Sequence, residues 1–149
     1  ERYQENLKDL PVTMNPVKLN GADIEPNYWL SCLLINKEAM CRQMRGEQES
    51  LYVSEPGKSC PTEILEALMA FNAEGRPIWK PMHMQPMYRM NAFIGRDGNM
   101  RARTNAYIAS TCEDIGGDIF NRGLCLPSDN KMTEEQQNKI IEVIRGCFE

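Results

Sequence analysis

The residues best suited to chemistry lie close together in the segment 74–86, EGRPIWKPMHMQP. Arg76, Lys80 and His83, the single histidine of the chain, are of types that bind phosphate or carboxylate groups, and Trp79 offers an apolar wall beside them. Three prolines in the same segment fix φ and remove backbone donors, so the segment should be extended and stiff. The pattern favours a binding site for a small anionic ligand.

The distribution of charge supports an anionic ligand but leaves a second interpretation open. Residues 76–103 carry six basic residues and one acidic residue, within a chain whose net charge is −4. The overall charge argues against general nucleic-acid binding, and no nucleic-acid partner is expected. The alternative is a proline-rich connector whose Trp and Met side chains cap the core, with His83 bonded to a carbonyl at the edge of that core.

The same segment carries a resemblance to a known family. RPIWKPMHMQP (76–86) resembles the R-P-x-x-K-P-x-H-x-Q-P signature of the DegT-type sugar-nucleotide aminotransferases, which are pyridoxal-phosphate enzymes of fold type I. Two further blocks fit in the right order. PNYWLSCLLI (26–35) resembles the first strand of that family's C-terminal small domain, and NRGLCLPS (121–128) with MTEEQQNKIIEVI (132–144) resemble its last strand and helix.

The resemblance implies that this chain is the substrate-side small domain of a cytoplasmic enzyme of polysaccharide biosynthesis. Such an enzyme transfers an amino group to a nucleotide-linked keto sugar, and the complete enzyme would be a homodimer that uses pyridoxal phosphate. The family's large domain, with its Schiff-base lysine, has no counterpart in this sequence. The chain alone is therefore expected to be inactive and to bind no cofactor, and the large domain is its expected partner.

The family motif implies roles for individual residues. By direct match, His83 and Lys80 lie near the nucleotide diphosphate at the mouth of the active site. Arg76 matches the motif arginine, although the three residues before it depart from the family pattern. Trp79 and Tyr28 could stack against sugar or base, whereas aromatic residues in such runs are often part of the core. The resemblance assigns no catalytic, cofactor-binding or metal-binding residue to this chain.

Length and composition favour one globular domain, expected to span residues 1–149. The sequence is 42% hydrophobic and 26% charged, which is typical of globular proteins. No apolar run is long enough to cross a bilayer, and the N-terminus is too charged for a signal peptide, so no membrane partner is expected. The chain begins without methionine, which suits an excised fragment. A stand-alone module that binds an anionic metabolite or a protein partner is the alternative function.

The chain has six cysteines, a number that would allow three disulfides in a secreted domain. Cys32 and Cys125, however, lie inside apolar strand-like runs, and Cys147 lies on the apolar face of the last helix. There is no C-x-x-C pair and no N-x-S/T sequon, and a zinc site is poorly supported with one histidine. We expect mostly reduced cysteines in a cytoplasmic protein.

The pattern of apolar residues predicts an α/β fold that is α+β-like: a small, largely antiparallel sheet with helices packed on one face. The chain should begin with the end of a helix at 1–10, which in the family is the interdomain helix, followed by a loop with a short edge strand at 12–27 and a strand at 28–35. A helix at 60–73, ended by Gly75, and an extended stretch at 76–80 should come next. A strand at 123–126 and a last helix that opens on a Thr133 capping box complete the expected elements.

Two intervals lack a clear pattern. Residues 36–59, with one turn of helix at 38–44, and residues 88–103 are longer than the family norm and are expected to be irregular insertions. Residues 104–121 should be helical in places, with Gly116-Gly117 breaking the helix or marking a kink.

Overall fold

The computed structural model describes residues 1–14, 18–19, 22–23, 27, 29–46, 49–95, 98–99 and 113–149. The chain falls into two compact units, where the sequence predicts a single domain. The first unit contains Glu1–Ile78 and Arg122–Glu149, and the second contains Trp79–Asn121. No helix in the described part of the chain is long and apolar enough to cross a membrane.

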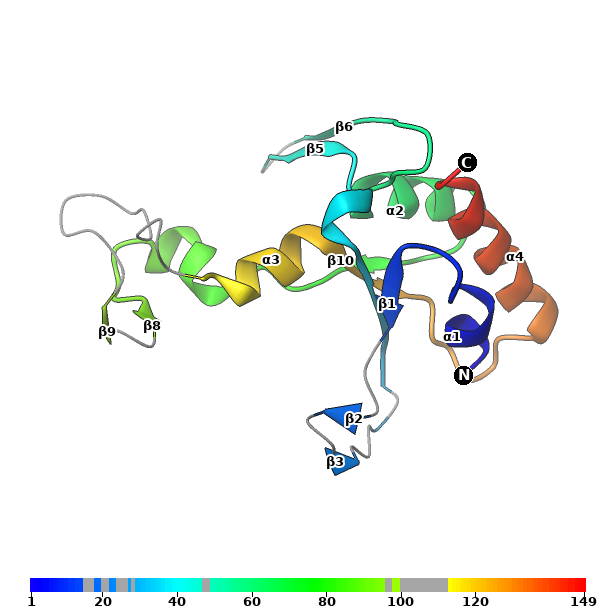
Figure 1. Ribbon diagram of the computed structural model, residues 1–149, viewed down its shortest axis with the longest axis horizontal. Coiled ribbons are helices and arrows are strands. Elements are labelled where there is room, and N and C mark those ends of the chain that lie inside the picture. Colours follow the sequence, from blue (N-terminus) through cyan, green and yellow to red (C-terminus); the bar gives the residue numbers. More distant parts are fainter. Residues whose placement is uncertain are drawn as a thin grey trace. The chain divides into compact units, whose positions relative to one another are not determined.

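The first unit is built on a four-stranded antiparallel sheet (Figure 1). Its strand order is β1-β4-β10-β7, from β1 (Val12–Met14), β4 (Ser31–Ile35), β10 (Gly123–Leu126) and β7 (Arg76–Pro77). The apolar run of β4 is explained by its central position, where it pairs with β1 on one side and β10 on the other. In the register, Leu33 lies opposite Leu124 and Cys32 opposite Cys125.

Three helices pack on one face of this sheet: α1 (Arg2–Asn6), α2 (Pro61–Ala70) and α4 (Glu134–Gly146). Alternate strand residues point to that face and join one buried cluster with the helices, formed in part by Leu33, Ile35, Leu124, Leu126, Tyr3, Leu7, Ile64, Leu68, Ile140, Ile141 and Ile144. Figure 1 shows α2 and α4 side by side. The predicted fold class is confirmed.

The helix ends agree with the sequence in two places and differ in a third. The capping box of α4 is present, because Thr133 Oγ1 accepts from the Gln136 backbone and Gln136 Oε1 accepts from the Thr133 backbone. Pro61 occupies the first turn of α2. However, α2 ends at Ala70, and Asn72, with a φ of 56°, takes the left-handed conformation expected of Gly75.

Gly75 has a different reason to be glycine, and Phe71 lies beyond the end of the helix that was predicted to include it. A Cβ on Gly75 would lie 2.8 Å from Leu65 Cδ2 and 3.1 Å from Leu68 Cδ1, so the chain passes α2 too closely for a side chain. Phe71 is 68% exposed, because the helix has already ended when the chain reaches it.

The interval 36–59 contains regular structure where an irregular insertion was expected. A short 3₁₀ turn, η1 (Lys37–Ala39), precedes a hairpin of β5 (Arg42–Arg45) and β6 (Ser50–Val53). The base of this excursion is closed by two backbone hydrogen bonds, Cys41 N to Ser59 O and Ser59 N to Ala39 O, each 3.0 Å long. The excursion is thus tied to the core at its base. A second small pair, β2 (Lys18–Leu19) with β3 (Ala22–Asp23), follows β1.

The second unit has short elements: the 3₁₀ turns η2 (Met82–Met84) and η3 (Pro86–Tyr88), the strand pair β8 (Ile94–Gly95) with β9 (Gly98–Asn99), and α3 (Ile115–Arg122), whose last residue belongs to the first unit. The β8–β9 pair lies inside the expected irregular interval. Gly116-Gly117 lies within the first turn of α3 and does not break it, whereas the predicted helical positions before residue 113 lie outside the described residues.

Candidate functional site

The proline-rich segment is divided between the two units. Arg76 lies in β7 of the first unit, opposite Cys125 of β10, whereas Trp79, Lys80 and His83 belong to the second unit. The segment is extended at Arg76-Pro77 and then turns through η2, because proline at residue 81 leads directly into a 3₁₀ turn. Tyr28, the fifth predicted binding residue, lies outside the described residues.

His83 makes the clearest polar contact in the second unit. Its Nε2 lies 2.7 Å from Oδ2 of Asp114, which is 31 positions later in the chain. The two side chains are 16% and 28% exposed, so the pair is largely shielded from solvent. A carboxylate therefore holds the imidazole in place.

Asp114 is itself held by the start of α3. Its Oδ1 accepts from the backbone N–H of Gly117 at 2.9 Å, as the side chain of a residue just before a helix commonly does. A Cβ on Gly117 would lie 2.5 Å from Asp114 Oδ2, so this arrangement needs glycine at that position. Both carboxylate oxygens are thus engaged, one by the helix and one by His83.

Two further contacts orient the motif. The rings of His83 and Phe93 are 4.5 Å apart at their centroids and tilted by 54°, so Phe93 covers part of the imidazole. Gln85 Nε2 donates to the backbone oxygen of Lys80 at 3.2 Å, which ties that backbone to the turn. Asp114 and Phe93 were missed from the sequence, since the family motif contains neither, and only the Asp-x-x-Gly spacing of a helix cap marks Asp114.

The remaining predicted residues are more exposed. Arg76 forms an ion pair with Glu74 at 2.5 Å, and both side chains are more than 70% exposed, so the pair adds little stability. Trp79 is 63% exposed and is not a core residue. The structure therefore brings His83 and Lys80 into the same short, turn-stabilised segment and leaves Arg76 as an exposed base on an edge strand.

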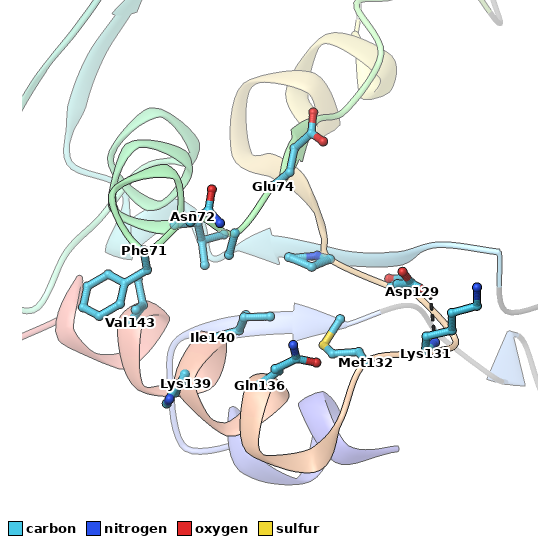
Figure 2. Close-up of a pocket in the computed structure, with 14 residues that line it drawn as sticks. Phe71, Asn72, Glu74, Asp129, Lys131, Met132, Gln136, Lys139, Ile140 and Val143 are labelled. Carbon is cyan, nitrogen blue, oxygen red and sulfur yellow. Dashed lines mark hydrogen bonds between the residues drawn. The ribbon is translucent and has the colours of Figure 1, made fainter.

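An open groove of about 710 Å³ lies between the end of α2, the N-terminal half of α4 and the loop after β10 (Figure 2). Phe71 and Val143 lie at one end of it, and Asp129 and Lys131, joined by a hydrogen bond from the Lys131 backbone, lie at the other. None of the predicted binding residues lines this groove. The groove and the motif are therefore separate features.

Pyridoxal phosphate needs a lysine to form an imine, and such a lysine is activated by desolvation or by a neighbouring cation. The two lysines that line the groove, Lys131 and Lys139, do not fit this role. Lys139 is 64% exposed and pairs with Glu135 on the surface, and Lys131 is exposed. The groove residues thus do not suit the cofactor.

No family model matches the chain. In sequence it is similar to EpsN of Bacillus subtilis (strain 168), a protein assigned as a pyridoxal phosphate-dependent aminotransferase. The two are 38% identical over 88 residues, which make up 59% of this chain and 19% of EpsN. The chain therefore spans about a fifth of the length of this relative.

Three solved structures share the fold over almost all of this chain. A DegT DnrJ EryC1 StrS aminotransferase from Brucella abortus has a TM-score of 0.56 at 20% identity, covering 97% of this chain and 28% of that one. The Streptococcus pneumoniae protein Spr1654, assigned as a sugar aminotransferase and solved in its PMP form, has a TM-score of 0.64 at 15% identity, covering 99% and 28%.

The aminotransferase TlmJ from Streptoalloteichus hindustanus has a TM-score of 0.56 at 12% identity, covering 98% of this chain and 29% of that one. At these identities the likeness is one of fold, and it extends over less than a third of each structure. The resemblance predicted from the sequence is confirmed: this chain is similar, in sequence and in fold, to a part of a DegT-type pyridoxal phosphate-dependent aminotransferase.

Proposed function

We propose that this chain is the C-terminal, substrate-side small domain of a cytoplasmic DegT-type sugar-nucleotide aminotransferase. The observation that carries the proposal is the 38% identity over 88 residues to an assigned pyridoxal phosphate-dependent aminotransferase. Its fold supports the same function, since it matches about 28% of each of two such enzymes. The complete enzyme would transfer an amino group to a nucleotide-linked keto sugar and act as a homodimer.

In this proposal the chain's own residues bind and orient the nucleotide sugar. Lys80 and His83 contact the diphosphate, because an ammonium group and an imidazole N–H both donate to phosphate oxygens. The hydrogen bond to Asp114 limits rotation of the His83 ring and so reduces the entropy lost on binding. Arg76 adds positive charge, and Trp79 and Tyr28 stack against sugar or base. The large domain supplies pyridoxal phosphate, which carries the amino group between substrates.

The first experiment tests whether this chain alone holds the cofactor. We expect no stoichiometric label when the isolated chain is incubated with pyridoxal phosphate and then reduced with borohydride. Mass spectrometry of the peptides locates any label. Stoichiometric labelling of Lys80 would contradict the proposal, because it would make Lys80 the imine-forming residue.

The second experiment uses the complete polypeptide, in which this chain is joined to a large domain. Lys80→Ala should weaken nucleotide-sugar binding by roughly 1.5 to 3 kcal/mol, the range for a hydrogen bond to a charged group. The loss should shrink at high salt because exposed charges are screened. Lys131→Ala, which removes an exposed lysine outside the motif, is the matched control and should leave affinity unchanged.

His83→Ala in the same polypeptide should weaken substrate binding and leave the absorbance of the bound cofactor unchanged. A variant that keeps full affinity but loses structure would instead assign His83 to the fold. If the isolated chain binds the nucleotide sugar as tightly as the complete polypeptide does, the alternative of a stand-alone binding module is favoured.

A further inference from the structure

A second group of reactive side chains lies in the first unit and is independent of the proposed function. Cys41 follows η1, Cys60 immediately precedes α2, and Glu63 lies in the first turn of α2. One ligand atom of each, two sulfurs and one carboxylate oxygen, lies within 4.8 Å of the other two. We propose that these three residues bind a divalent transition-metal ion, and that Zn²⁺ fits them best.

The geometry is close to that of an assembled site. Zinc binds sulfur at about 2.3 Å and carboxylate oxygen at about 2.0–2.2 Å in a tetrahedron, so two of its ligand atoms lie about 3.5 to 3.8 Å apart. Cys41 Sγ is already 4.0 Å from Glu63 Oε2. Small side-chain rotations are enough to close the remaining gap. Two thiolates with one carboxylate favour zinc over magnesium or calcium, which prefer oxygen ligands alone.

The fold positions the three ligands through the backbone. The hydrogen bonds Cys41 N to Ser59 O and Ser59 N to Ala39 O place Cys41 beside the residue that precedes Cys60. Cys60 and Glu63 are three positions apart at the start of α2, a spacing that brings their side chains to one face. Cys41 and Cys60 are 3% and 0% exposed, so the ligands are held within packed structure.

Hydrogen bonds from two serines hold the carboxylate in place. Ser59 Oγ donates to Glu63 Oε2 at 2.8 Å, and Ser54 Oγ donates to Glu63 Oε1 at 2.7 Å. Such outer contacts fix the orientation of metal ligands and raise metal affinity. Of the three ligands, only Glu63 lines a groove, which has a volume of about 750 Å³, so an ion would meet the carboxylate first and reach the two buried thiols past it.

A second pair of neighbouring cysteines, Cys32 and Cys125, serves as a control, because it tests whether any two close thiols bind the metal. Cys32 and Cys125 face each other across β4 and β10 with their sulfurs 3.8 Å apart, close enough to share an ion. Among the described residues, however, this pair belongs to no group of three metal-binding side chains, whereas Cys41, Cys60 and Glu63 do. The sequence did not predict the site, because its cysteines lack C-x-x-C spacing and because Glu63 is not a typical zinc-finger ligand.

The test is a titration of the reduced chain with Co²⁺, which substitutes for Zn²⁺ and gives a thiolate-to-metal absorption band. We expect one equivalent of Co²⁺ to bind, with the band of two thiolates, and Zn²⁺ to displace it. Cys41→Ser and Cys60→Ser should each remove most of the band, and Glu63→Gln should lower affinity. Ser59→Ala should lower affinity about 10- to 100-fold. The double variant Cys32→Ser/Cys125→Ser should bind as the wild type does.

A second measurement avoids variants that fail to fold. In the unaltered chain, Zn²⁺ should slow alkylation of Cys41 and Cys60, located by mass spectrometry, and leave Cys32 and Cys125 unaffected. The proposal is overturned if the reduced chain takes up no metal, if Glu63→Gln binds with unchanged affinity, or if the double variant alone loses the band. A Cys41–Cys60 disulfide that persists under reducing conditions would equally overturn it.

Discussion

The two units of the chain bury apolar residues very differently. Every buried hydrophobic side chain among the described residues lies in the first unit, on its sheet, on its helices or at the base of its hairpin. The second unit instead exposes many of its large apolar side chains, including Trp79, Met82, Met87, Met90, Ile94 and Ile115. The first unit is therefore stabilised by a core, whereas the described residues of the second unit are joined by local turns and polar contacts.

The buried core thus lies in the first unit, whereas Lys80 and His83, the residues proposed to bind the diphosphate, lie in the second. The described residues of the second unit include no buried hydrophobic side chain, and a segment of about 40 residues is too small to bury a sizeable core alone. Its described residues are ordered by proline turns, by α3 and the β8–β9 pair, and by the hydrogen bonds that Asp114 makes with His83 and the Gly117 N–H. Under the proposed function, its exposed apolar side chains are a surface that other parts of the complete enzyme would cover.

Leu33→Ala should have the largest effect on stability. Leu33 is 1% exposed at the centre of the sheet, and its truncation should lower the free energy of unfolding by roughly 2 to 5 kcal/mol through lost burial and a cavity. Met87→Ala, at a side chain that is 77% exposed in the second unit, is the control and should change it by less than about 0.5 kcal/mol. Urea unfolding measures both. Equal losses would remove the contrast between the units.

Gly117→Ala should disturb the second unit locally. The added Cβ would displace the Asp114 carboxylate and break its contact with His83, so a net loss of about 1 kcal/mol is expected despite the better helix propensity of alanine. Because the chain has one histidine, the NMR signals of that ring report the change directly.

Gly116→Ala is the matched control for this substitution. Its Cβ would lie 3.4 Å from Pro81 Cγ, an ordinary contact, so the histidine signals should stay as in the wild type. If both alanine variants shift those signals equally, the Asp114 contact is not what holds the imidazole.

Tyr3→Phe should cost about 0.5 to 1.5 kcal/mol, because Tyr3 Oη donates to the backbone oxygen of Pro127 at 2.9 Å and links α1 to the loop after β10. Burial raises the pKa of Tyr3 from 10.0 to about 12. Its neutral form thus contributes stability that is fully present below pH 10 and is lost as pH rises toward 12. The stability advantage of the wild type should shrink over that range, and tyrosinate absorbance should show a late titration that is lost in the variant.

Asp9→Asn should have the smallest effect. The hydrogen bond from Arg145 lowers the pKa of Asp9 from 3.8 to about 2. A lowered pKa gives stability that is present above pH 4 and lost as pH falls toward 2, so wild type and variant should differ at neutral pH and converge in acid. Thermal unfolding across this range, repeated at high salt, measures the difference. A difference in stability between wild type and variant that widens in acid would contradict this prediction.

Sequence patterns predicted the first unit better than the second, for a physical reason. Leu33, inside the predicted strand at 28–35, and the Thr133 capping box follow local rules of burial and backbone satisfaction, and each has the predicted place in the structure. The β5–β6 hairpin was not predicted because its strands are only four residues long and mostly exposed, and because β5 is largely polar, so the sequence shows no clear alternation. The end of α2 was misassigned because Asn72 took a role that glycine usually fills.

The candidate site was only partly predictable from sequence. His83 and Lys80 stood out through their residue types and the family motif. Asp114 did not, because a contact across 31 positions depends on how the chain folds back. The two units also divide the motif between Ile78 and Trp79, a division that no local pattern marks.

The pairing of β4 with β10 has a consequence for how the protein is made. The two central strands are separated by roughly 90 positions, and Arg145 near the C-terminus bonds Asp9 near the N-terminus. During translation, β4 leaves the ribosome long before β10 is synthesised, and its apolar side chains stay without that partner strand in the meantime. We expect the sheet to close only after β10 has emerged, so this unit should fold late relative to the synthesis of β4.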